Sequence, residues 1–219
     1  KAGWVNRVAS RITTEKPDLV LLAGDFIVEK SEHAQYLSAF SRISSLIPTY
    51  AVLGDHDYHV NQFQKLDLEL AQTVHNALTD AGVQVLDNAV VEINLYDASF
   101  TLVGLDDWTA GRTRMQPCAS PCVTLIHNPD FILNSEFTAK AGQAKKTDLI
   151  LAGNTHGGQI RLPFIGPVGR LPSRLPRTFD KGLFNVGEKT RLFITSGISE
   201  SGPRARLFNL PEIVLLELH

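Results

Sequence analysis

Short, nearly continuous apolar runs alternate along this chain with longer stretches in which apolar residues recur every three or four positions. The short runs are typical of strands that are covered on both faces. They lie at residues 19–22, 49–53, 100–103, 123–126, 149–151, 192–195 and 213–218. The longer stretches predict helices around residues 4–12, 31–47 and 65–81, followed by the helix-ending residues Pro17, Pro48 and Gly82. Strands that alternate with helices predict a layered α/β domain.

Residues 83–103 break this alternation, because three strand-like segments follow one another there with only turn residues between them. We therefore expect either one mixed sheet or two sheets. Residues 153–177 are rich in Gly, Pro and Arg and predict a long ordered loop or lid. No internal repeat or linker divides the 219 residues, so a single domain is expected.

The charge balance is close to neutral, with 21 Lys and Arg against 23 Asp and Glu. This balance argues against a broad electrostatic grip on nucleic acid. No apolar run is long enough to span a bilayer, and no signal-peptide pattern opens the sequence. The expected location is the cytoplasm. The two cysteines, Cys118 and Cys122, have no second pair to complete a zinc site, and we expect reduced thiols beside a Pro-rich loop.

Polar side chains follow five of the expected strands at the point where each strand ends. The segments are Gly24-Asp25, Gly54-Asp55-His56-Asp57, Asp106-Asp107, His127-Asn128 and Gly153-Asn154-Thr155-His156. In open α/β sheets the carboxyl ends of the strands form the ligand crevice, so these side chains are expected to converge. One Gly-Asp pair is usually a turn and one His is usually a satisfied buried residue. The ordered set of Asp and His, however, predicts a metal site.

This set resembles the calcineurin-like metallophosphoesterase family, whose motifs run Gly-Asp, Gly-Asn-His-Asp/Glu, a single His and Gly-His-x-His. Residues 127–130, 157–163 and 196–213 are similar to bacterial phosphodiesterases of the branch with enzymes that cleave UDP-2,3-diacylglucosamine in lipid A synthesis. The resemblance implies an α-β-β-α sandwich of two mixed β-sheets flanked by helices over residues 1–219. It also implies hydrolysis of a phosphodiester or pyrophosphate bond by water at a centre of two divalent metal ions.

The resemblance also assigns a role to each candidate residue. The metal ligands it implies are Asp25 as the bridging carboxylate, Asp55, His127, Asn154 and His156.

The other roles that the resemblance implies concern the substrate. His56 corresponds to the acid that protonates the leaving group, and Asp57 to a residue that orients its ring. Gly157 and Gly158 would let the backbone pass close to the site, and Arg161 would meet a phosphate oxygen.

Three departures from the family pattern shape these expectations. The opening Asp-x-His motif is absent, so we expect the chain to begin just downstream of the family's first strand. Asp55 stands where the family has Asn, and Asn154 where it has His. The first change adds a carboxylate and the second replaces an imidazole nitrogen with an amide oxygen, which favours Mn²⁺ as the metal, with Mg²⁺, Zn²⁺ and iron as alternatives.

Two other interpretations compete with hydrolysis. A degenerate family member would bind a phosphorylated ligand or partner without turning it over, in keeping with the three departures. A nucleotide-binding α/β domain of another type is disfavoured, because no Gly-rich phosphate loop follows the first strand.

The expected substrate is a phosphorylated small molecule that is UDP-linked or lipid-linked. For an acylated substrate, a peripheral contact with the inner face of a membrane would come from residues 164–168 and Leu171-Pro172, interleaved with Arg161, Arg170, Arg174 and Arg177. The alternative is that these residues form a Pro-stiffened loop folded over the domain.

Overall fold

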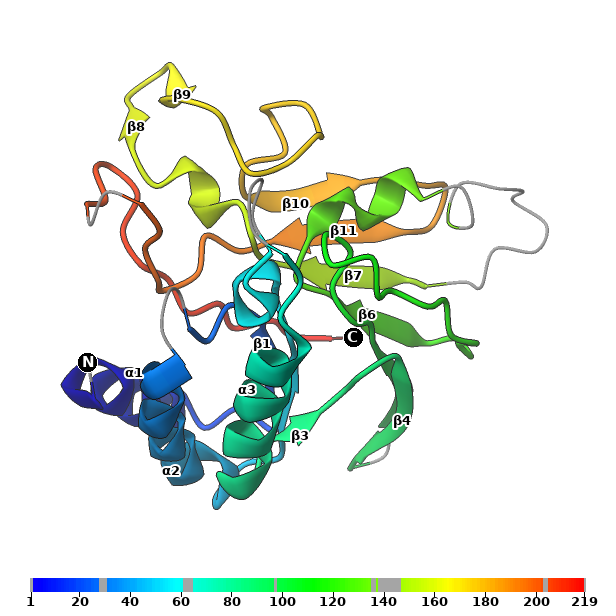
Figure 1. The fold of residues 1–219 in the computed structure, drawn as a ribbon. Helices are drawn as coiled ribbons and strands as arrows, with labels where there is room; N and C mark the ends of the chain where they lie inside the picture. Colours follow the sequence, from blue (N-terminus) through cyan, green and yellow to red (C-terminus); the bar gives the residue numbers. More distant parts are fainter. Residues whose placement is uncertain are drawn as a thin grey trace.

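Two β-sheets that pack face to face form the framework in the computed structural model, which describes residues 2–27, 31–60, 65–96, 98–134, 137, 147–202 and 205–218 (Figure 1). The smaller sheet has the order β1 (Val20–Ala23), β2 (Thr49–Val52) and β3 (Gln84–Val85), paired in parallel. The larger sheet has the order β10 (Gly182–Asn185), β11 (Arg191–Ile194), β7 (Leu149–Ala152), β6 (Cys122–Leu125), β5 (Ala98–Gly104) and β4 (Ala89–Leu95). Its outer pairs are antiparallel and its inner pairs are parallel, so this sheet is mixed. The layered α/β fold expected from the sequence is confirmed.

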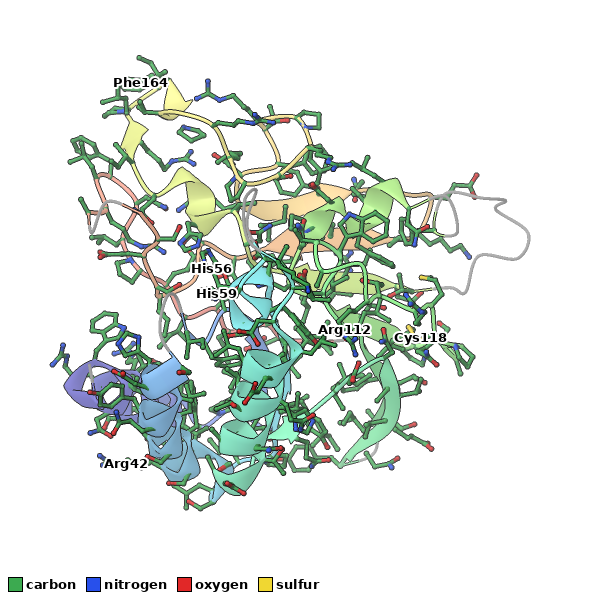
Figure 2. The ribbon with its side chains drawn as sticks, viewed as in Figure 1. Arg42, His56, His59, Arg112, Cys118 and Phe164 are labelled. Atoms are coloured by element: carbon green, nitrogen blue, oxygen red, sulfur yellow. A yellow bond between two sulfur atoms is a disulfide. The ribbon has the colours of Figure 1, made fainter. Side chains whose placement is uncertain are left out.

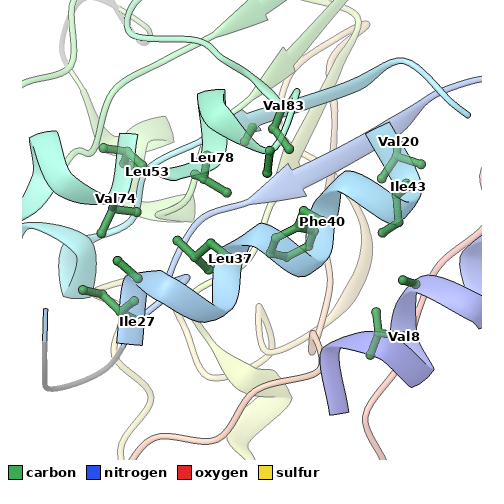
Figure 3. Packing of buried hydrophobic residues seen from close by; sticks show 14 of the residues in the cluster. Val8, Val20, Ile27, Leu37, Phe40, Ile43, Leu53, Val74, Leu78 and Val83 are labelled. Carbon is green, nitrogen blue, oxygen red and sulfur yellow. The ribbon is translucent and has the colours of Figure 1, made fainter. Parts of the chain in front are cut away.

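Helices cover the outer face of the smaller sheet. They are α1 (Ala2–Glu15), the 3-10 helix η1 (Ser31–Phe40), α2 (Ser41–Ser44) and α3 (Leu68–Asp80). Their apolar side chains form one cluster with residues of β1 and β2, in which Ile43, Val74 and Leu78 are completely buried (Figure 3). All three expected helices are therefore present. The second differs from expectation, because its first ten residues adopt the tighter 3-10 geometry.

The strands divide their side chains between two apolar layers. In β2, Ala51 packs into the helical layer, whereas Tyr50 and Val52 pack into the layer between the sheets. In β7, Leu151 packs between the sheets and Ile150 packs on the outer face of the larger sheet. Since strand side chains alternate with a period of two, both faces of these strands are buried, which explains their continuous apolar character.

The outer face of the larger sheet is covered by loops and by the 3-10 helix η3 (Pro129–Leu133) within the described ranges. Phe131 is buried there against strand residues, and Trp108 and Phe179 pack on the same layer. In the described ranges, the layer on the smaller sheet is thus α-helical, whereas the layer on the larger sheet includes loops, the 3-10 helix η3 and the helical residue Phe137.

The apolar run at residues 213–218 is not a strand, which corrects the expectation from the sequence. Ile213, Leu215 and Leu218 are 44% to 57% exposed. An apolar run forms a strand only beside an edge that accepts its backbone hydrogen bonds, and no described strand pairs with this one. Among the described strands β1 pairs with β2 alone, and a further strand upstream of the sequence stays a prediction.

Cys118 and Cys122 form a disulfide, with Cα atoms 6.0 Å apart, so the expectation of reduced thiols is wrong. Cys122 is the first residue of β6 and is completely buried. The sequence could not reveal this bond, because pairing depends on how the Pro-rich loop returns to the strand.

Short turns follow the strands at the edge where the candidate residues lie. The turn η2 (Asp55–Tyr58) follows β2, and η4 (His156–Gly158) follows β7. Beyond η4, the hairpin of β8 (Arg161–Leu162) and β9 (Gly166–Pro167) projects from the body of the molecule, within the loop expected there (Figure 1). In the described part of the chain, every helix is too short or too polar to cross a bilayer.

Candidate metal centre

The side chain of His127 lies at the junction between the two sheets. It follows β6 of the larger sheet, and its Nδ1 atom is 2.6 Å from the carbonyl oxygen of Ala23, the last residue of β1 in the smaller sheet. Because a carbonyl can only accept, Nδ1 must carry the proton. The lone pair of the neutral ring then lies on Nε2, which is the usual arrangement of a metal-ligating histidine.

Two carboxylates face the Nε2 atom of His127. It lies 3.3 Å from Oδ2 of Asp25 and 3.2 Å from Oδ1 of Asp55. One ligand atom from each of these three residues lies within 4.8 Å of the other two. Nε2 of His127 and Oδ1 of Asp55 are buried without a hydrogen-bond partner. Buried polar atoms are rarely left unpaired, and two oxygens and one nitrogen that face one another suit a divalent cation.

The charges of these groups stabilise one another. Burial lowers the pKa of His127, but the carboxylates of Asp25 and Asp55 outweigh it and raise the pKa well above its usual value. Burial raises the pKa of Asp25, but His127 and His56 outweigh it and lower the pKa below its usual value. The site therefore keeps its negative charge, and without a cation a proton on His127 would balance it.

Two glycines allow the strand ends to approach one another and His127. A Cβ atom on Gly24 would lie 2.7 Å from the backbone nitrogen of Gly54 and 2.8 Å from Nδ1 of His127. A Cβ atom on Gly54 would lie 2.3 Å from Oδ1 of Asp25. Glycine before each aspartate is therefore a steric requirement of the site, in addition to its role in the turn.

The carboxylate of Asp57 holds the loops after β1 and β2 together. It is completely buried and accepts hydrogen bonds from the backbone N–H groups of Asp25, Phe26, Ile27 and Gly54, at 2.9 to 3.1 Å. Burial and the negative charge of Asp25 raise the pKa of Asp57 to about 7, while two of these donors act against them. Where the structure describes its contacts, Asp57 thus engages the backbone of both loops rather than the ring of His56.

His56 lies beside the three-residue cluster. Its backbone N–H donates to Oδ1 of Asp25 at 3.1 Å, and its ring acts on the pKa of Asp25. The side chain of His56 is partly exposed (Figure 2). Its position, between the buried carboxylates and solvent, is compatible with proton transfer to a bound substrate.

Asn154 and His156 follow β7 at the same edge and have strained backbones, with φ angles of 64° and 53°. The amide nitrogen of Asn154 donates to the carbonyl oxygen of Pro172 at 2.9 Å. Burial lowers the pKa of His156, which is also influenced by the charges of Asp25 and His127, and its Nδ1 atom is buried without a hydrogen-bond partner. The structure therefore brings His156 near the cluster of Asp25, Asp55 and His127, without placing it within that cluster.

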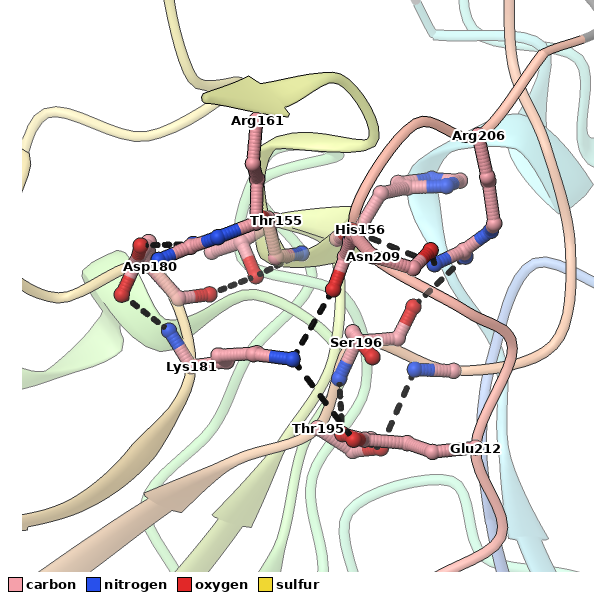
Figure 4. A network of polar contacts seen from close by, with 12 residues as sticks. Thr155, His156, Arg161, Asp180, Lys181, Thr195, Ser196, Arg206, Asn209 and Glu212 are labelled. Atoms are coloured by element: carbon pink, nitrogen blue, oxygen red, sulfur yellow. Dashed lines mark hydrogen bonds and ion pairs between the residues drawn. The ribbon is translucent and has the colours of Figure 1, made fainter. Parts of the chain in front are cut away.

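A polar network from the C-terminal part of the chain holds the turn that carries His156 (Figure 4). The side-chain amide of Asn209 donates to the carbonyl oxygen of His156 at 2.6 Å and accepts from Nζ of Lys181 at 2.9 Å. The guanidinium of Arg206 donates to the carbonyl oxygen of Ser196 at 2.7 Å. Asn209 thus binds the backbone of His156 directly, whereas Arg206 binds the adjacent segment at Ser196 and reaches the carbonyl oxygen of His156 at 3.4 Å.

The predicted substrate-binding residues are packed against the protein. A Cβ atom on Gly157 would lie 2.8 Å from the side chain of Ser196, and one on Gly158 would overlap the ring of Pro167. The guanidinium of Arg161 forms an ion pair with Asp180 and donates to the carbonyl oxygen of Gly157 at 3.0 Å. These contacts account for the three residues structurally, and their contact with a substrate stays a prediction.

Sequence reasoning noted Asp106 and Asp107 at the end of a strand but gave them no role. Asp107 is completely buried, and its Oδ2 atom has no hydrogen-bond partner. Burial raises its pKa to about 7, with a further increase from the charges of Asp55 and Asp25. The charges of Asp25, Asp55 and His127 therefore act on the carboxyl group of Asp107. Arg206 and Asn209 were also missed, because nothing in their local sequence connects them to β7.

Comparison with known proteins gives consistent results. The sequence profile of calcineurin-like phosphoesterases matches residues 4–158. The chain is 32% identical to the phosphodiesterase YaeI of Escherichia coli over 212 residues, which cover 93% of this chain and 71% of YaeI. It is 31% identical to the uncharacterized metallophosphoesterase Cj0846 of Campylobacter jejuni over 218 residues, which cover 98% of this chain and 54% of the relative.

Among solved structures, a similar fold occurs in the sulfate thiohydrolase SoxB of Thermus thermophilus, crystallised with glycerol. The TM-score is 0.50 at 13% identity, and the match covers 88% of this chain and 36% of that chain. At this level of identity the likeness concerns the fold alone.

Proposed function

The chain belongs to the calcineurin-like phosphoesterase family, and from this premise we propose that it hydrolyses a phosphodiester or pyrophosphate bond with the help of two divalent metal ions. The observation that carries the proposal is the position of Nε2 of His127. It faces oxygens of Asp25 and Asp55 at 3.3 Å and 3.2 Å, in a buried setting with no hydrogen-bond partner. Two carboxylate oxygens and an imidazole nitrogen that face one another in a buried setting suit a divalent cation, which would take the place of the proton on His127.

In this proposal Asp25, Asp55 and His127 would hold one ion, and Asp25 would also be available to a second. Asn154 and His156 complete the two sites, since both lie on the turn after β7 at the same edge. In sites of this kind divalent ions polarise a phosphoryl oxygen and make water a nucleophile at neutral pH. The oxygen-rich donor set favours Mn²⁺, with Mg²⁺, Zn²⁺ and iron as alternatives.

The proton that the reaction requires would come from His56. As the oxygen of water forms its bond to phosphorus, the bond to the leaving oxygen breaks, and that oxygen takes a proton from the ring of His56. The proton lost by the attacking water is released to solvent, from which His56 is reprotonated. Asp57 would act as a positioning residue, because it holds the backbone on both sides of Asp25 and at Gly54.

The name of YaeI supports a phosphodiester as the substrate class. Within that class we propose a UDP-linked or lipid-linked phosphoester. Neither a nucleotide nor an acyl chain is needed for the chemistry, so this part of the proposal concerns specificity alone.

Hydrolysis of bis(p-nitrophenyl) phosphate tests the proposal. We expect activity with added Mn²⁺, its loss with a chelator, and its loss in His127→Ala. A matched control is Glu92→Gln, which removes an exposed carboxylate in β4, and it should leave activity unchanged. A folded chain without metal-dependent activity would contradict hydrolysis and would favour the alternative, a family member that binds a phosphorylated ligand without turning it over.

A further inference from the structure

Two segments that are far apart in the sequence combine into one exposed apolar surface. One segment is the hairpin of β8 and β9, and the other precedes the C-terminal run. Their exposed apolar residues, here called the apolar ridge, are Leu162, Phe164, Ile165, Val168, Leu207, Phe208 and Leu210. The exposed fractions run from 41% for Leu162 to 109% for Phe164. Single exposed apolar residues are ordinary, but contiguous groups of this kind mark interaction sites.

Backbone contacts make the apolar ridge one unit. Ile160 and Leu207 form a parallel bridge, in which the N–H of Arg161 donates to the carbonyl oxygen of Leu207 at 2.9 Å. The N–H of Leu207 donates to the carbonyl oxygen of Gln159 at 3.1 Å. A depression of about 420 Å³ lies between the hairpin and Phe208. The apolar side chains are therefore presented by a defined surface rather than by two independent loops.

Both phenylalanines of the ridge have an unfavourable backbone conformation. The φ angle is 66° at Phe164 and 50° at Phe208, a region that bulky residues rarely adopt. Phe164 lies at the outer end of the hairpin, directed away from the body of the molecule (Figure 2). Backbone strain that keeps an aromatic ring in water has no benefit for folding, and such strain is commonly associated with function.

The charges in the segment that carries the hairpin are of one sign, whereas the second segment of the ridge lies between Glu200 and Glu212. Residues 157–179 contain four arginines and neither Asp nor Glu. Arg161 is neutralised by Asp180. Arg170, Arg174 and Arg177 are exposed, and within the described ranges none of them forms an ion pair. The loop that carries them is anchored by Leu171 and Leu175, which are buried, so Leu171 is not part of the exposed surface that the sequence suggested.

We propose that the apolar ridge docks the protein on an anionic phospholipid surface. Aromatic and aliphatic side chains at a projecting tip can enter the headgroup boundary, and nearby arginines attract anionic lipids. A protein partner would need a groove that matches the projecting hairpin, whereas lipid adapts to its shape. The inference does not depend on hydrolysis, because it concerns a surface formed outside the metal cluster.

Co-sedimentation with vesicles tests the apolar part of the proposal. The chain is mixed with vesicles of phosphatidylcholine alone or of phosphatidylcholine with phosphatidylglycerol. We expect binding to the anionic vesicles and a loss of about tenfold in Phe164→Ser. The control is Leu46→Ser, which removes a side chain that is 72% exposed and follows α2, an element far from β8 and β9 (Figure 1). Equal urea midpoints would show that all three proteins are folded.

A second variant tests the contribution of the arginines to vesicle binding. Arg170→Ser combined with Arg174→Ser should weaken binding about fivefold per arginine at low salt, and added salt should remove most of this difference. Absence of binding to anionic vesicles, or binding that Phe164→Ser leaves unchanged, would overturn the proposal. So would a dimer in sedimentation equilibrium that Phe164→Ser dissociates, because the ridge would then be an interface between two copies.

Discussion

The hydroxyl group of Tyr58 donates a hydrogen bond of 2.6 Å to Oδ1 of Asp106, and this bond joins the two sheets beside the metal cluster. Tyr58 ends the turn that carries Asp55, His56 and Asp57, whereas Asp106 follows β5 of the larger sheet. Asp106 is almost completely buried and also accepts from Nε of Arg112 at 2.7 Å. The position of the cluster thus depends on a polar contact outside it.

Tyr58→Phe should therefore destabilise the fold. The variant leaves a buried carboxylate short of one donor, which costs about 1–3 kcal/mol of unfolding free energy. Tyr96→Phe is the matched control, because Tyr96 makes the same type of bond to Asp18 at 2.8 Å but is 91% exposed. Urea denaturation would measure the loss of unfolding free energy in each variant. Equal losses in the two variants would contradict a structural role for the contact between Tyr58 and Asp106.

Gly54→Ala should abolish metal binding with little effect on backbone strain. The φ angle of Gly54 is −113°, which alanine adopts readily, so the effect would come from the new Cβ atom beside Oδ1 of Asp25. Gly187→Ala is the control, since its Cβ would make ordinary contacts with Thr190 at 3.5 Å. Titration with Mn²⁺ followed by electron paramagnetic resonance would compare them. Unaltered affinity in Gly54→Ala would show that Asp25 is not a ligand.

The convergence of Asp25, Asp55 and His127 could be predicted from the sequence, whereas the contacts around these residues could not. Asp25, Asp55 and His127 each lie two or three residues beyond the end of a strand, and strand direction places them at one edge. Asn209 reaches His156 across 53 positions through a segment without regular structure, so no local pattern could indicate it. The role of Asp57 could not be predicted either, because its acceptor bonds depend on the path of another loop.

In the fold, too, local sequence predicts some features, whereas others depend on distant segments. Residues 49–53 and 149–151 were correctly expected to be strands, since burial on both faces is encoded in their composition. Residues 213–218 have the same composition but no edge to pair with in the described part of the chain. Apolar character therefore predicts that a segment can be a strand, whereas the presence of a partner decides whether it is one.

Metal affinity should rise with pH through the neutral range. The carboxylates of Asp25 and Asp55 raise the pKa of His127 well above its usual value despite its burial, so the ring is protonated in the metal-free protein. A metal ion must displace that proton, which makes affinity increase by up to about tenfold per pH unit below the raised pKa. Calorimetry in buffers of different ionisation enthalpy would detect one released proton. Binding without proton release would mean that Nε2 of His127 is not a ligand.

Asp107 should make the metal-free protein less stable as the pH rises. Its pKa is about 7 in the folded protein, above the usual 3.8, because burial opposes its charge. The folded state then holds the proton more tightly than the unfolded state. The unfolding free energy consequently falls between about pH 4 and about pH 7, by roughly 4 kcal/mol at most.

Asp107→Asn cannot ionise, so its stability should change less over that range. The new amide lowers the unfolding free energy at every pH. The informative quantity is therefore the slope of the unfolding free energy against pH, not its absolute value. Urea denaturation in a chelator at several pH values would give both slopes. Parallel slopes would show that Asp107 is not the group that titrates.

Asn209→Ala should weaken metal-dependent hydrolysis although Asn209 makes no contact with the cluster of Asp25, Asp55 and His127 in the described structure. It is buried, and its amide donates to the carbonyl oxygen of His156 at 2.6 Å, in a turn with a φ angle of 53° at that residue. Without this donor the strained turn can relax and move the imidazole. Loss of an outer hydrogen bond to a metal site typically costs about 10- to 100-fold in metal affinity or activity.

The control for this variant is Asn76→Ala, which removes an exposed amide that pairs with Gln72 on α3. Two readouts separate positioning from general destabilisation in Asn209→Ala. Mn²⁺ affinity and kcat for bis(p-nitrophenyl) phosphate should both fall at a temperature where the variant is fully folded by circular dichroism. If stability fell while metal affinity and kcat stayed unchanged, Asn209 would support the fold without positioning His156. If only metal affinity fell and kcat at saturating Mn²⁺ stayed unchanged, Asn209 would act on metal affinity alone, and the predicted loss of kcat would be wrong.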